Sequence, residues 1–296
     1  MNRSPTRILI TGGSGLLGSA LIEAAPREAV VFATHRNRPV SPPARGLQLN
    51  LTDGAALRSA IREARPGLIL HTAANTDVEW CETHPVEAQS LHVSATLALR
   101  AEAPDAKLVY ISTNSVFDGR QGWYAEGDAT GPLNVYSQSK LSGESAALPQ
   151  DLVVRTTFYG LSSRPKQESF ALSVVRRLRN GEKVSAAVDQ ISNHLHVRQV
   201  AQAIYALCEA NAKGVIHLGA TEALSTYELA KMIARQFELD DRPIERTTLN
   251  ELAVRFQWKA RRASNLSLNP KLASEVICLP SPAESLILLQ ADISRM

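Results

Sequence analysis

Short apolar runs alternate with stretches of helical periodicity along the first half of the chain. Short runs of this kind are typical of strands buried in a parallel sheet. They occur at Ile8–Ile10, Val30–Ala33, Leu68–His71, Leu108–Ser112 and Leu152–Arg155. Between or after them the pattern predicts helices at Gly54–Ala64, Val86–Glu102, Val135–Ala147 and Ser169–Asn180. The alternation predicts an α/β fold with a Rossmann-type doubly wound parallel sheet and right-handed crossovers.

The first strand leads into a glycine-rich turn, Thr11–Gly18, and Ser19–Glu23 is then predicted to be helical. Gly12 allows the tight turn, Gly15 lets backbone approach a pyrophosphate, and Gly18 lets the helix pack closely on the strand. Free N–H groups at the helix start, with the positive end of its dipole, favour an anionic phosphate. The turn therefore predicts a dinucleotide cofactor, and a glycine-rich turn that binds nothing is the alternative.

The end of the second strand indicates which dinucleotide is used. An acidic residue there would bind a ribose 2′-hydroxyl, whereas an arginine would accept a 2′-phosphate. The segment that follows Ala33 contains no acid before Pro39, and it contains Arg36 and Arg38. NADP(H) is therefore favoured over NAD(H), with a solvated basic loop as the alternative.

A catalytic group is predicted where a later strand ends and a helix follows it. The strand ends in hydroxyl residues, Ser112 and Thr113, and Tyr136 and Lys140 are spaced to share one helical face. A lysine ammonium there can lower the pKa of the phenol and hydrogen-bond a nicotinamide ribose. The phenol can then give its proton to a carbonyl oxygen as hydride arrives at carbon, while Thr113 polarises that oxygen. A Tyr-x-x-x-Lys pair alone arises by chance, but its order after the glycine turn and hydroxyl strand favours an oxidoreductase.

Composition excludes several other classes of protein. The 296 residues suffice for one large α/β domain, or for one domain and a smaller lobe. With 32 basic against 29 acidic side chains and no basic stripe, a nucleic-acid partner is not expected. No signal-peptide core or apolar run of transmembrane length is present, so no membrane partner is expected. Cys81, Cys208 and Cys278 form no Cys-x-x-Cys, which favours a reducing cytoplasm over disulfides or zinc.

Several other groups of polar residues are weaker indications of function. The segment Glu79–His84 gathers ligand-type side chains, but its spacing matches no zinc pattern, so no metal is predicted. His194 and His196 alternate on a possible strand, where a structural or substrate-lining role is favoured over a metal. A Gly-x-Ser-x-Gly elbow is absent, which argues against a hydrolase. Ser225 and Glu228 fit a capping box at a helix start.

Further segments accompany these motifs along nearly the whole chain. They are Thr11–Gly18, Ala73–Thr76, Ser112–Gly119, Pro132–Glu144, Val154–Gly160, Asp189–Gln190 and Arg261–Leu266. Together they resemble the extended short-chain dehydrogenase/reductases. Within that family the chain is most similar to the dTDP-4-dehydrorhamnose reductase branch, which also contains the regulatory beta subunit of methionine adenosyltransferase. The stretches Val116–Gly119 and Pro132–Glu144 are the most specific to this branch.

The resemblance implies an NADP(H)-dependent reductase of a nucleotide-linked 4-keto-6-deoxysugar, with Thr113, Tyr136 and Lys140 as its catalytic set. It implies cofactor contacts at Gly12, Ser14, Gly15, Leu16, Leu17, Gly18, Arg36, Asn50, Leu51, Ala73, Ala74, Tyr136, Lys140 and Thr157. It implies substrate contacts at Thr76, Asn114, Ser115 and Phe117. It also implies a dinucleotide-binding Rossmann domain over residues 1–155, to which 186–212 return, and a substrate-binding lobe over 156–185 and 213–296.

The chain departs from the family pattern mainly on the substrate side. Asn114 and Ser115 replace an aspartate and an aromatic residue, and His92 stands where the family has a helix asparagine. Ile191–Leu195, which includes His194, stands where the family commonly has Gly-x-Pro-Thr. Asn50 replaces an aspartate that contacts adenine, although asparagine still offers an oxygen acceptor.

Two alternatives therefore remain open. One is a cofactor-binding regulatory subunit that catalyses nothing, which the altered substrate side permits, although such a protein need not keep the catalytic set. The other is a sugar-nucleotide epimerase or dehydratase that retains NAD through purification. The sequence determines neither the sugar, the nucleotide base, the direction of reaction nor the oligomeric state, and a homodimer is compatible with it.

Overall fold

A computed structural model describes residues 6–161 and 168–295, and the chain divides into two compact units. The first unit contains Met1–Thr113, Asn134–Arg155 and Ala201–Ile216. The second contains Asn114–Leu133, Thr156–Val200 and His217–Met296.

The unit boundaries differ from the predicted domains at residues 114–133, 186–200 and 213–216. Residues 114–133 and 186–200 belong to the second unit, although the sequence placed them in the Rossmann domain. The reason is visible at Asn114, whose Nδ2 donates to Ser192 Oγ at 2.8 Å and to the Leu266 carbonyl at 3.1 Å. These bonds connect the segment after Thr113 with parts of the chain far along the sequence. The segment that returns to the first unit is 201–216 rather than 186–212.

The first unit is built on a seven-stranded sheet. Its strands are β1 (Arg7–Thr11), β2 (Val30–His35), β3 (Arg45–Gln48), β4 (Leu68–His71), β5 (Lys107–Thr113), β6 (Leu152–Thr156) and β11 (Gly214–Leu218). Their order is β11-β6-β5-β4-β1-β2-β3, and β1 pairs in parallel with both β2 and β4. The predicted doubly wound fold is confirmed. The strand order reverses beside β1, which makes the carboxyl ends of β1 and β4 the expected ligand site.

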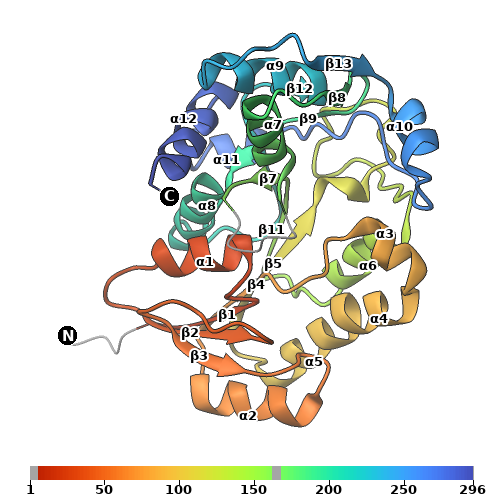
Figure 1. The fold of residues 1–296 in the computed structure, drawn as a ribbon. Helices are drawn as coiled ribbons and strands as arrows, with labels where there is room; N and C mark the ends of the chain where they lie inside the picture. Colours follow the sequence, from red (N-terminus) through yellow and green to blue (C-terminus); the bar gives the residue numbers. More distant parts are fainter. Residues whose placement is uncertain (1–5, 162–167, 296) are drawn as a thin grey trace. The chain divides into compact units, whose positions relative to one another are not determined.

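Helices cover both faces of this sheet (Figure 1). On one face, α2 (Gly54–Ala64) and α5 (Ala95–Glu102) pack on a core that includes Leu9, Ile69 and Leu108. On the other face, α1 (Leu16–Glu23) lies beside α8 (Val197–Glu209), and the Tyr205 hydroxyl donates to the Leu21 carbonyl at 2.9 Å. The catalytic helix expected from the sequence is α6 (Val135–Glu144).

The helix predicted at Val86–Glu102 is present as one helical stretch from Pro85 to Glu102, and its hydrogen-bond pattern changes within that stretch. The structure has α3 (Val78–Thr83), α4 (Pro85–Gln89), a π-helical turn η1 (Ser90–Ser94) and then α5. The Ala95 N–H reaches back to the Ser90 carbonyl, which is the five-residue spacing of a π turn. Such turns are rare and are frequent at functional sites.

The second unit combines short strands with longer helices. Its elements are η2 (Asn114–Val116), β7 (Phe158–Tyr159), α7 (Phe170–Arg179), β8 (Val184–Ala187), β9 (Ile191–Ser192), β10 (Leu195–His196), β12 (Leu224–Ser225), α9 (Thr226–Gln236), β13 (Ile244–Thr247), α10 (Leu249–Phe256), α11 (Lys271–Ser274) and α12 (Pro282–Ile293). Its core lies where α7, α9 and α12 meet the β8–β13 pair, around Val174, Ile233 and Leu286. The predicted capping box is present, since Ser225 and Glu228 bond reciprocally at the start of α9.

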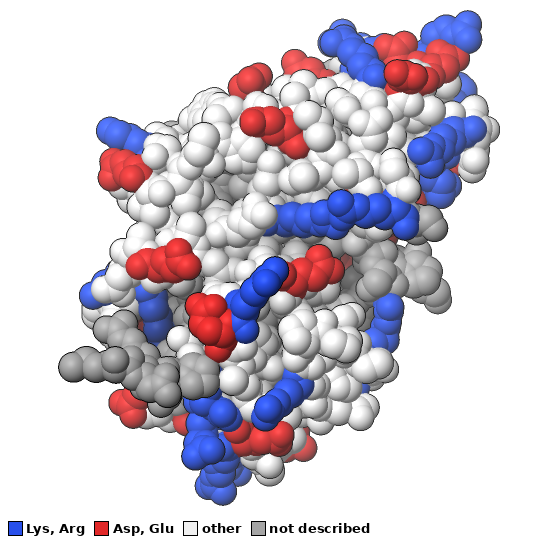
Figure 2. Space-filling view, turned by 90° about the vertical axis from the view of Figure 1, so that its left-hand side faces the viewer, with Lys and Arg blue, Asp and Glu red and all other residues white. Residues whose placement is uncertain are grey.

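Charged side chains do not gather by sign on the face shown in Figure 2, where acidic and basic groups are interspersed. Among the described helices, none combines the length and apolar character needed to cross a membrane.

Candidate active site

The glycine-rich turn after β1 has the backbone geometry that a pyrophosphate site requires. Gly12 has φ of 71°, and a Cβ there would lie 2.9 Å from the Ala73 Cα, so only glycine fits. The Gly15 N–H closes the turn on the Gly12 carbonyl at 2.8 Å. Gly15 is also the N-cap of α1 and has no side chain to bond the first N–H groups of that helix. Those groups and the helix dipole suit an anion.

The other residues predicted to contact a cofactor follow the carboxyl ends of neighbouring strands. Ala73 and Ala74 come after β4, and the Ala73 N–H donates to Thr11 Oγ1 at 3.3 Å. Arg36 is exposed directly after β2. Asn50 is exposed after β3, where its Oδ1 accepts the Thr52 N–H at 3.3 Å. The remaining predicted contacts lie as follows: Ser14 in the turn, Leu16, Leu17 and Gly18 in the first turn of α1, Leu51 buried after β3, and Thr157 after β6 in the second unit.

Thr113, Tyr136 and Lys140 all belong to the first unit, where Thr113 contacts Tyr136 and Lys140 lies one turn further along the helix that carries Tyr136. Thr113 is the last residue of β5, and its side chain forms a hydrogen bond with the Tyr136 phenol. Lys140 is buried on α6, the helix that carries Tyr136, and its Nζ lies 4.1 Å from the centroid of the Tyr110 ring. The helix that carries the pair is fixed at its start, because the Asn134 side chain accepts the Ser137 N–H at 2.9 Å.

Close packing at Gly143 lets α6 lie against β5 and the π-helical turn. A Cβ at Gly143 would collide with the Tyr110 hydroxyl and would lie 2.5 Å from the His92 carbonyl oxygen. The Tyr110 hydroxyl donates to the Lys140 carbonyl at 3.2 Å across the same contact. Sequence reasoning did not identify Gly143, although a glycine inside a helix is a recognisable signal of close approach.

The end of α6 is held by a buried ion pair. Arg155 on β6 forms bonds of 3.0 and 2.8 Å to the two carboxylate oxygens of Glu144. Ser112 Oγ donates to the same carboxylate at 2.5 Å. Both charged side chains are nearly inaccessible, so this pair joins α6 to the sheet beneath it.

Burial determines the protonation of Tyr136 and Lys140. It raises the pKa of Tyr136 to about 12, and the hydrogen bond with Thr113 lowers that pKa only in part. Burial also lowers the pKa of Lys140 to about 7, against the opposing effect of Glu144. Desolvation therefore dominates the pKa of the phenol, and the expected lowering of that pKa by Lys140 stays a prediction. At neutral pH the phenol keeps its proton, which is the state that a proton donor needs.

Two of the residues predicted to contact substrate are buried within the second unit. Phe117 is fully buried, and its ring stacks on that of Tyr124 with centroids 4.2 Å apart. Phe117 is thus part of the packed interior of the second unit, and its predicted substrate contact stays a prediction. The amide of Asn114 is buried and makes the two bonds to Ser192 and Leu266 described above. Ser115 Oγ lies 3.5 Å from Asn114 Oδ1, whereas Thr76 is exposed in the first unit.

The histidine-containing segment of the second unit is also well packed. Leu195 is buried in β10, and burial lowers the pKa of the neighbouring His194 to about 4. Among the residues that the structure describes, no group of three or more His, Cys, Asp or Glu side chains is placed to hold a metal ion.

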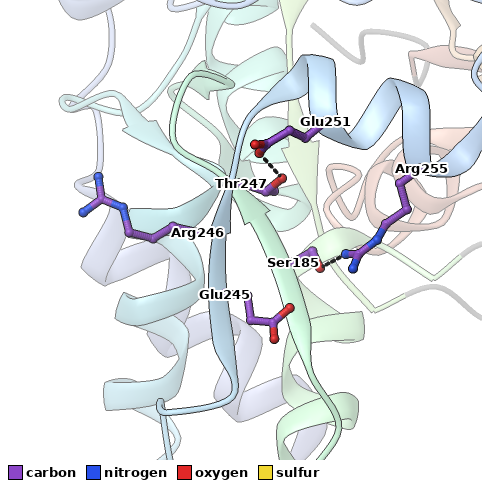
Figure 3. Close-up of a pocket in the computed structure, with 6 residues that line it drawn as sticks. All are labelled: Ser185, Glu245, Arg246, Thr247, Glu251 and Arg255. Atoms are coloured by element: carbon purple, nitrogen blue, oxygen red, sulfur yellow. Dashed lines mark hydrogen bonds between the residues drawn. The ribbon is translucent and has the colours of Figure 1, made fainter.

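A separate pocket of about 260 Å³ lies in the second unit and is lined by Ser185, Glu245, Arg246, Thr247, Glu251 and Arg255. Figure 3 shows two bonds within this lining: Arg255 Nη1 donates to Ser185 Oγ at 2.6 Å, and Thr247 Oγ1 donates to Glu251 at 2.8 Å. Arg246 points away from the others. The charges of this lining balance, and it includes none of the residues predicted from the sequence.

Residues 6–284 match the family model described as the RmlD substrate binding domain. The chain belongs to this RmlD family. The dTDP-4-dehydrorhamnose reductase of Mycobacterium tuberculosis is 31% identical over 271 residues, covering 86% of this chain and 84% of that protein. Methionine adenosyltransferase 2 subunit beta of Danio rerio is 33% identical over 246 residues, covering 79% and 74%.

Solved structures named dTDP-4-dehydrorhamnose reductase share the fold over nearly the whole chain. The dTDP-4-dehydrorhamnose reductase of Bacillus anthracis, solved in complex with NADP, is 25% identical with a TM-score of 0.84, covering 97% of this chain and 99% of that one. The resemblance inferred from the motifs is confirmed at the level of family and fold. The relatives bear both names that the sequence suggested, a reductase and a regulatory subunit.

Proposed function

We propose that this RmlD family protein is an NADP(H)-dependent reductase of a nucleotide-linked 4-keto-6-deoxysugar. The observation that carries the proposal is the assembly of Thr113, Tyr136 and Lys140, with the phenol protonated at neutral pH and hydrogen-bonded to the threonine. A purely regulatory protein has no need of a buried lysine beside a protonated tyrosine. The relatives named as dTDP-4-dehydrorhamnose reductases support the substrate class.

NADPH, when bound, supplies the hydride that reduces the keto carbon. Thr113 Oγ1 holds the carbonyl oxygen, and the Tyr136 hydroxyl gives that oxygen its proton, so the product is an alcohol. The ammonium of Lys140 stabilises the phenolate that remains on Tyr136. These roles need no other titrating group from the chain.

The cofactor is assigned to the carboxyl edge of the first unit's sheet. The backbone at Gly12 and the start of α1 suit its pyrophosphate, since a Cβ at Gly12 would collide with Ala73. Arg36, exposed after β2, is the proposed partner of the 2′-phosphate. The NADP complex of the Bacillus anthracis relative supports this choice of dinucleotide. The remaining proposed contacts are those predicted from the sequence.

A non-catalytic regulatory subunit is the second candidate, and one observation favours it. Asn114 and Phe117, which the family resemblance assigned to the substrate, are occupied in the interior of the second unit. The relatives named methionine adenosyltransferase 2 subunit beta give this candidate its precedent. For either candidate we propose a cytoplasmic location, which the three free cysteines support.

The test is NADPH consumption with dTDP-4-dehydro-6-deoxy-L-mannose, with the wild type beside Tyr136→Phe. Loss of the proton donor should lower turnover about a hundredfold or more, while NADPH affinity stays near that of the wild type. Equal turnover by the two proteins would refute the role of Tyr136. No turnover by a wild type that still binds NADPH would favour another keto-sugar or the regulatory subunit. NAD retained through purification would favour an epimerase or dehydratase.

A further inference from the structure

His92 occupies the π-helical turn beside the catalytic helix, and its side chain is buried between two elements of the first unit. The Asn75 N–H, in the loop after β4, donates to His92 Nε2 at 3.1 Å. His92 Nδ1 lies 2.8 Å from Ser139 Oγ on α6. Ser139 Oγ donates in turn to the Tyr136 carbonyl at 2.9 Å.

These contacts determine the protonation of the imidazole. A backbone N–H is only a donor, so Nε2 must be the unprotonated acceptor nitrogen. The neutral ring then carries its proton on Nδ1 and donates it to Ser139, whose own proton is directed to Tyr136. A protonated His92 would present an N–H to the Asn75 N–H, and two donors would face each other.

A second histidine, His71, is linked through Thr96 to the backbone carbonyl of His92. Thr96 Oγ1 donates to the His92 carbonyl at 2.8 Å, so it accepts from His71 Nε2–H at 2.9 Å. His71 Nδ1 is then the acceptor for Thr11 Oγ1 at 2.6 Å. His71 and His92 are thus both neutral, with the proton on Nε2 of His71 and on Nδ1 of His92. The Thr96 hydroxyl accepts from His71 and donates to the His92 carbonyl.

We propose that His92 is a positioning residue, which as the neutral Nδ1–H tautomer holds the Tyr136 helix in register with the loop that follows β4. That loop contains Ala73 and Ala74, the proposed backbone contacts of the cofactor, so His92 couples the cofactor side of the site to the proton donor. The effect on catalysis rests on the proposed reductase function, whereas the tautomer does not.

The charged and titratable groups around His92 agree with a neutral ring. Lys140 from α6 and His71 from β4 both interact with it, and the Tyr136 ring meets it edge-on with centroids 5.9 Å apart. Burial, followed by the charge of Lys140, lowers the pKa of His92 to about 3. A charged His92 would repel the ammonium that the reaction needs.

The first experiment is ¹⁵N NMR of the full-length protein with labelled histidine, with the His92 signals assigned by their loss in His92→Gln. We expect His92 as the Nδ1–H tautomer with no titration between about pH 5 and pH 8. An Nε2–H tautomer, or titration near the ordinary histidine pKa of about 6.5, would overturn the proposal. This readout needs no substrate, so it stands even if the reductase assay fails.

The second experiment compares Ser139→Ala with Ser137→Ala, two buried serines on the same helix. Within the described residues Ser137 Oγ has no hydrogen-bond partner, which makes it a matched control. We expect Ser139→Ala to lower kcat about tenfold with the Kd for NADPH unchanged, and Ser137→Ala to stay within about twofold. Equal kcat values for the two variants, in an active wild-type background, would overturn the positioning role.

Replacement of His92 itself separates hydrogen bonding from packing. His92→Phe keeps a planar ring and removes both bonds, so we expect a fall in kcat of about tenfold or more. His92→Gln retains an acceptor and a donor, and it should recover part of that loss. If the glutamine variant is no better than the phenylalanine variant while both remain folded, the hydrogen bonds are not what positions Tyr136.

Discussion

Thr113 and Asn114 are neighbours in the chain, yet they belong to two units in which their polar groups have different partners. In the first unit, packing at Gly143 and the Arg155–Glu144 pair hold α6, which leaves the Tyr136 phenol and Thr113 for the proposed proton transfer. In the second unit, the Asn114 amide Nδ2 donates hydrogen bonds to Ser192 Oγ and to the Leu266 carbonyl. Thr113 and Tyr136 of the first unit therefore support the proposed reaction. Asn114, which the family resemblance assigned to the substrate, holds segments of the second unit together.

Removing the Phe117 ring should have the largest effect on stability. The side chain is fully buried against Tyr124 and His217, so Phe117→Ala should lower the free energy of unfolding by about 3–5 kcal/mol. Urea denaturation followed by fluorescence measures it, with Tyr136→Phe as a control that keeps its ring. A loss below about 1 kcal/mol would return Phe117 to the substrate-facing role predicted from the family.

Lys140→Met should have different effects on turnover and on thermal stability. Turnover should fall about a hundredfold because the phenolate loses its ammonium. The melting temperature should stay level or rise, because burial already opposes the charged form of Lys140. Thermal unfolding beside a turnover assay tests both. A melting temperature several degrees lower would show that Lys140 serves the packing of α6 as well.

Turnover should also depend on pH near neutrality. The folded protein lowers the pKa of Lys140 to about 7, so its ammonium is present below that pH and is lost as pH rises through it. The Tyr136 pKa of about 12 leaves the phenol protonated throughout this range. Reductive kcat/KM should therefore fall as pH rises above about 7, by up to about tenfold per unit. A profile that stays flat to about pH 9 would contradict the role of the ammonium.

The smallest expected effect concerns the choice of dinucleotide. Arg36→Ser should weaken NADPH about tenfold and leave NADH within about twofold, since only NADPH has the 2′-phosphate. Arg27→Ser is a suitable control, because Arg27 is exposed before β2 rather than after it. Fluorescence titration gives both affinities. Parallel losses for NADPH and NADH would remove the assignment of Arg36.

The sequence located most strands of the first unit because an apolar run is a local signal. Ile8–Ile10 lies within β1, and Leu68–His71 coincides with β4. It missed β11 (Gly214–Leu218), and it missed β3, whose four residues Arg45–Gln48 include one buried side chain and so show no apolar run. The π-helical turn was also missed, since its apolar positions continue those of the helices on either side.

In the candidate site, too, residues related by local spacing were predicted, whereas contacts between distant segments were not. Tyr136 and Lys140 were found because their spacing is set by one helix turn. The burial of Phe117 depends on Tyr124 and His217, and the occupation of Asn114 depends on Leu266, so neither follows from local sequence. The network through His92 joins the Asn75 loop, the π-helical turn and α6, and no spacing rule relates these three.

The interleaving of the two units sets conditions on how the nascent chain acquires its structure. The chain passes from one unit to the other after Thr113, Leu133, Arg155, Val200 and Ile216. Strand β6 lies between β5 and β11, and β11 does not begin until Gly214. A ribosome must therefore release about three quarters of the 296 residues before the sheet can be completed, and that edge stays open to chaperones and to other strands in the meantime.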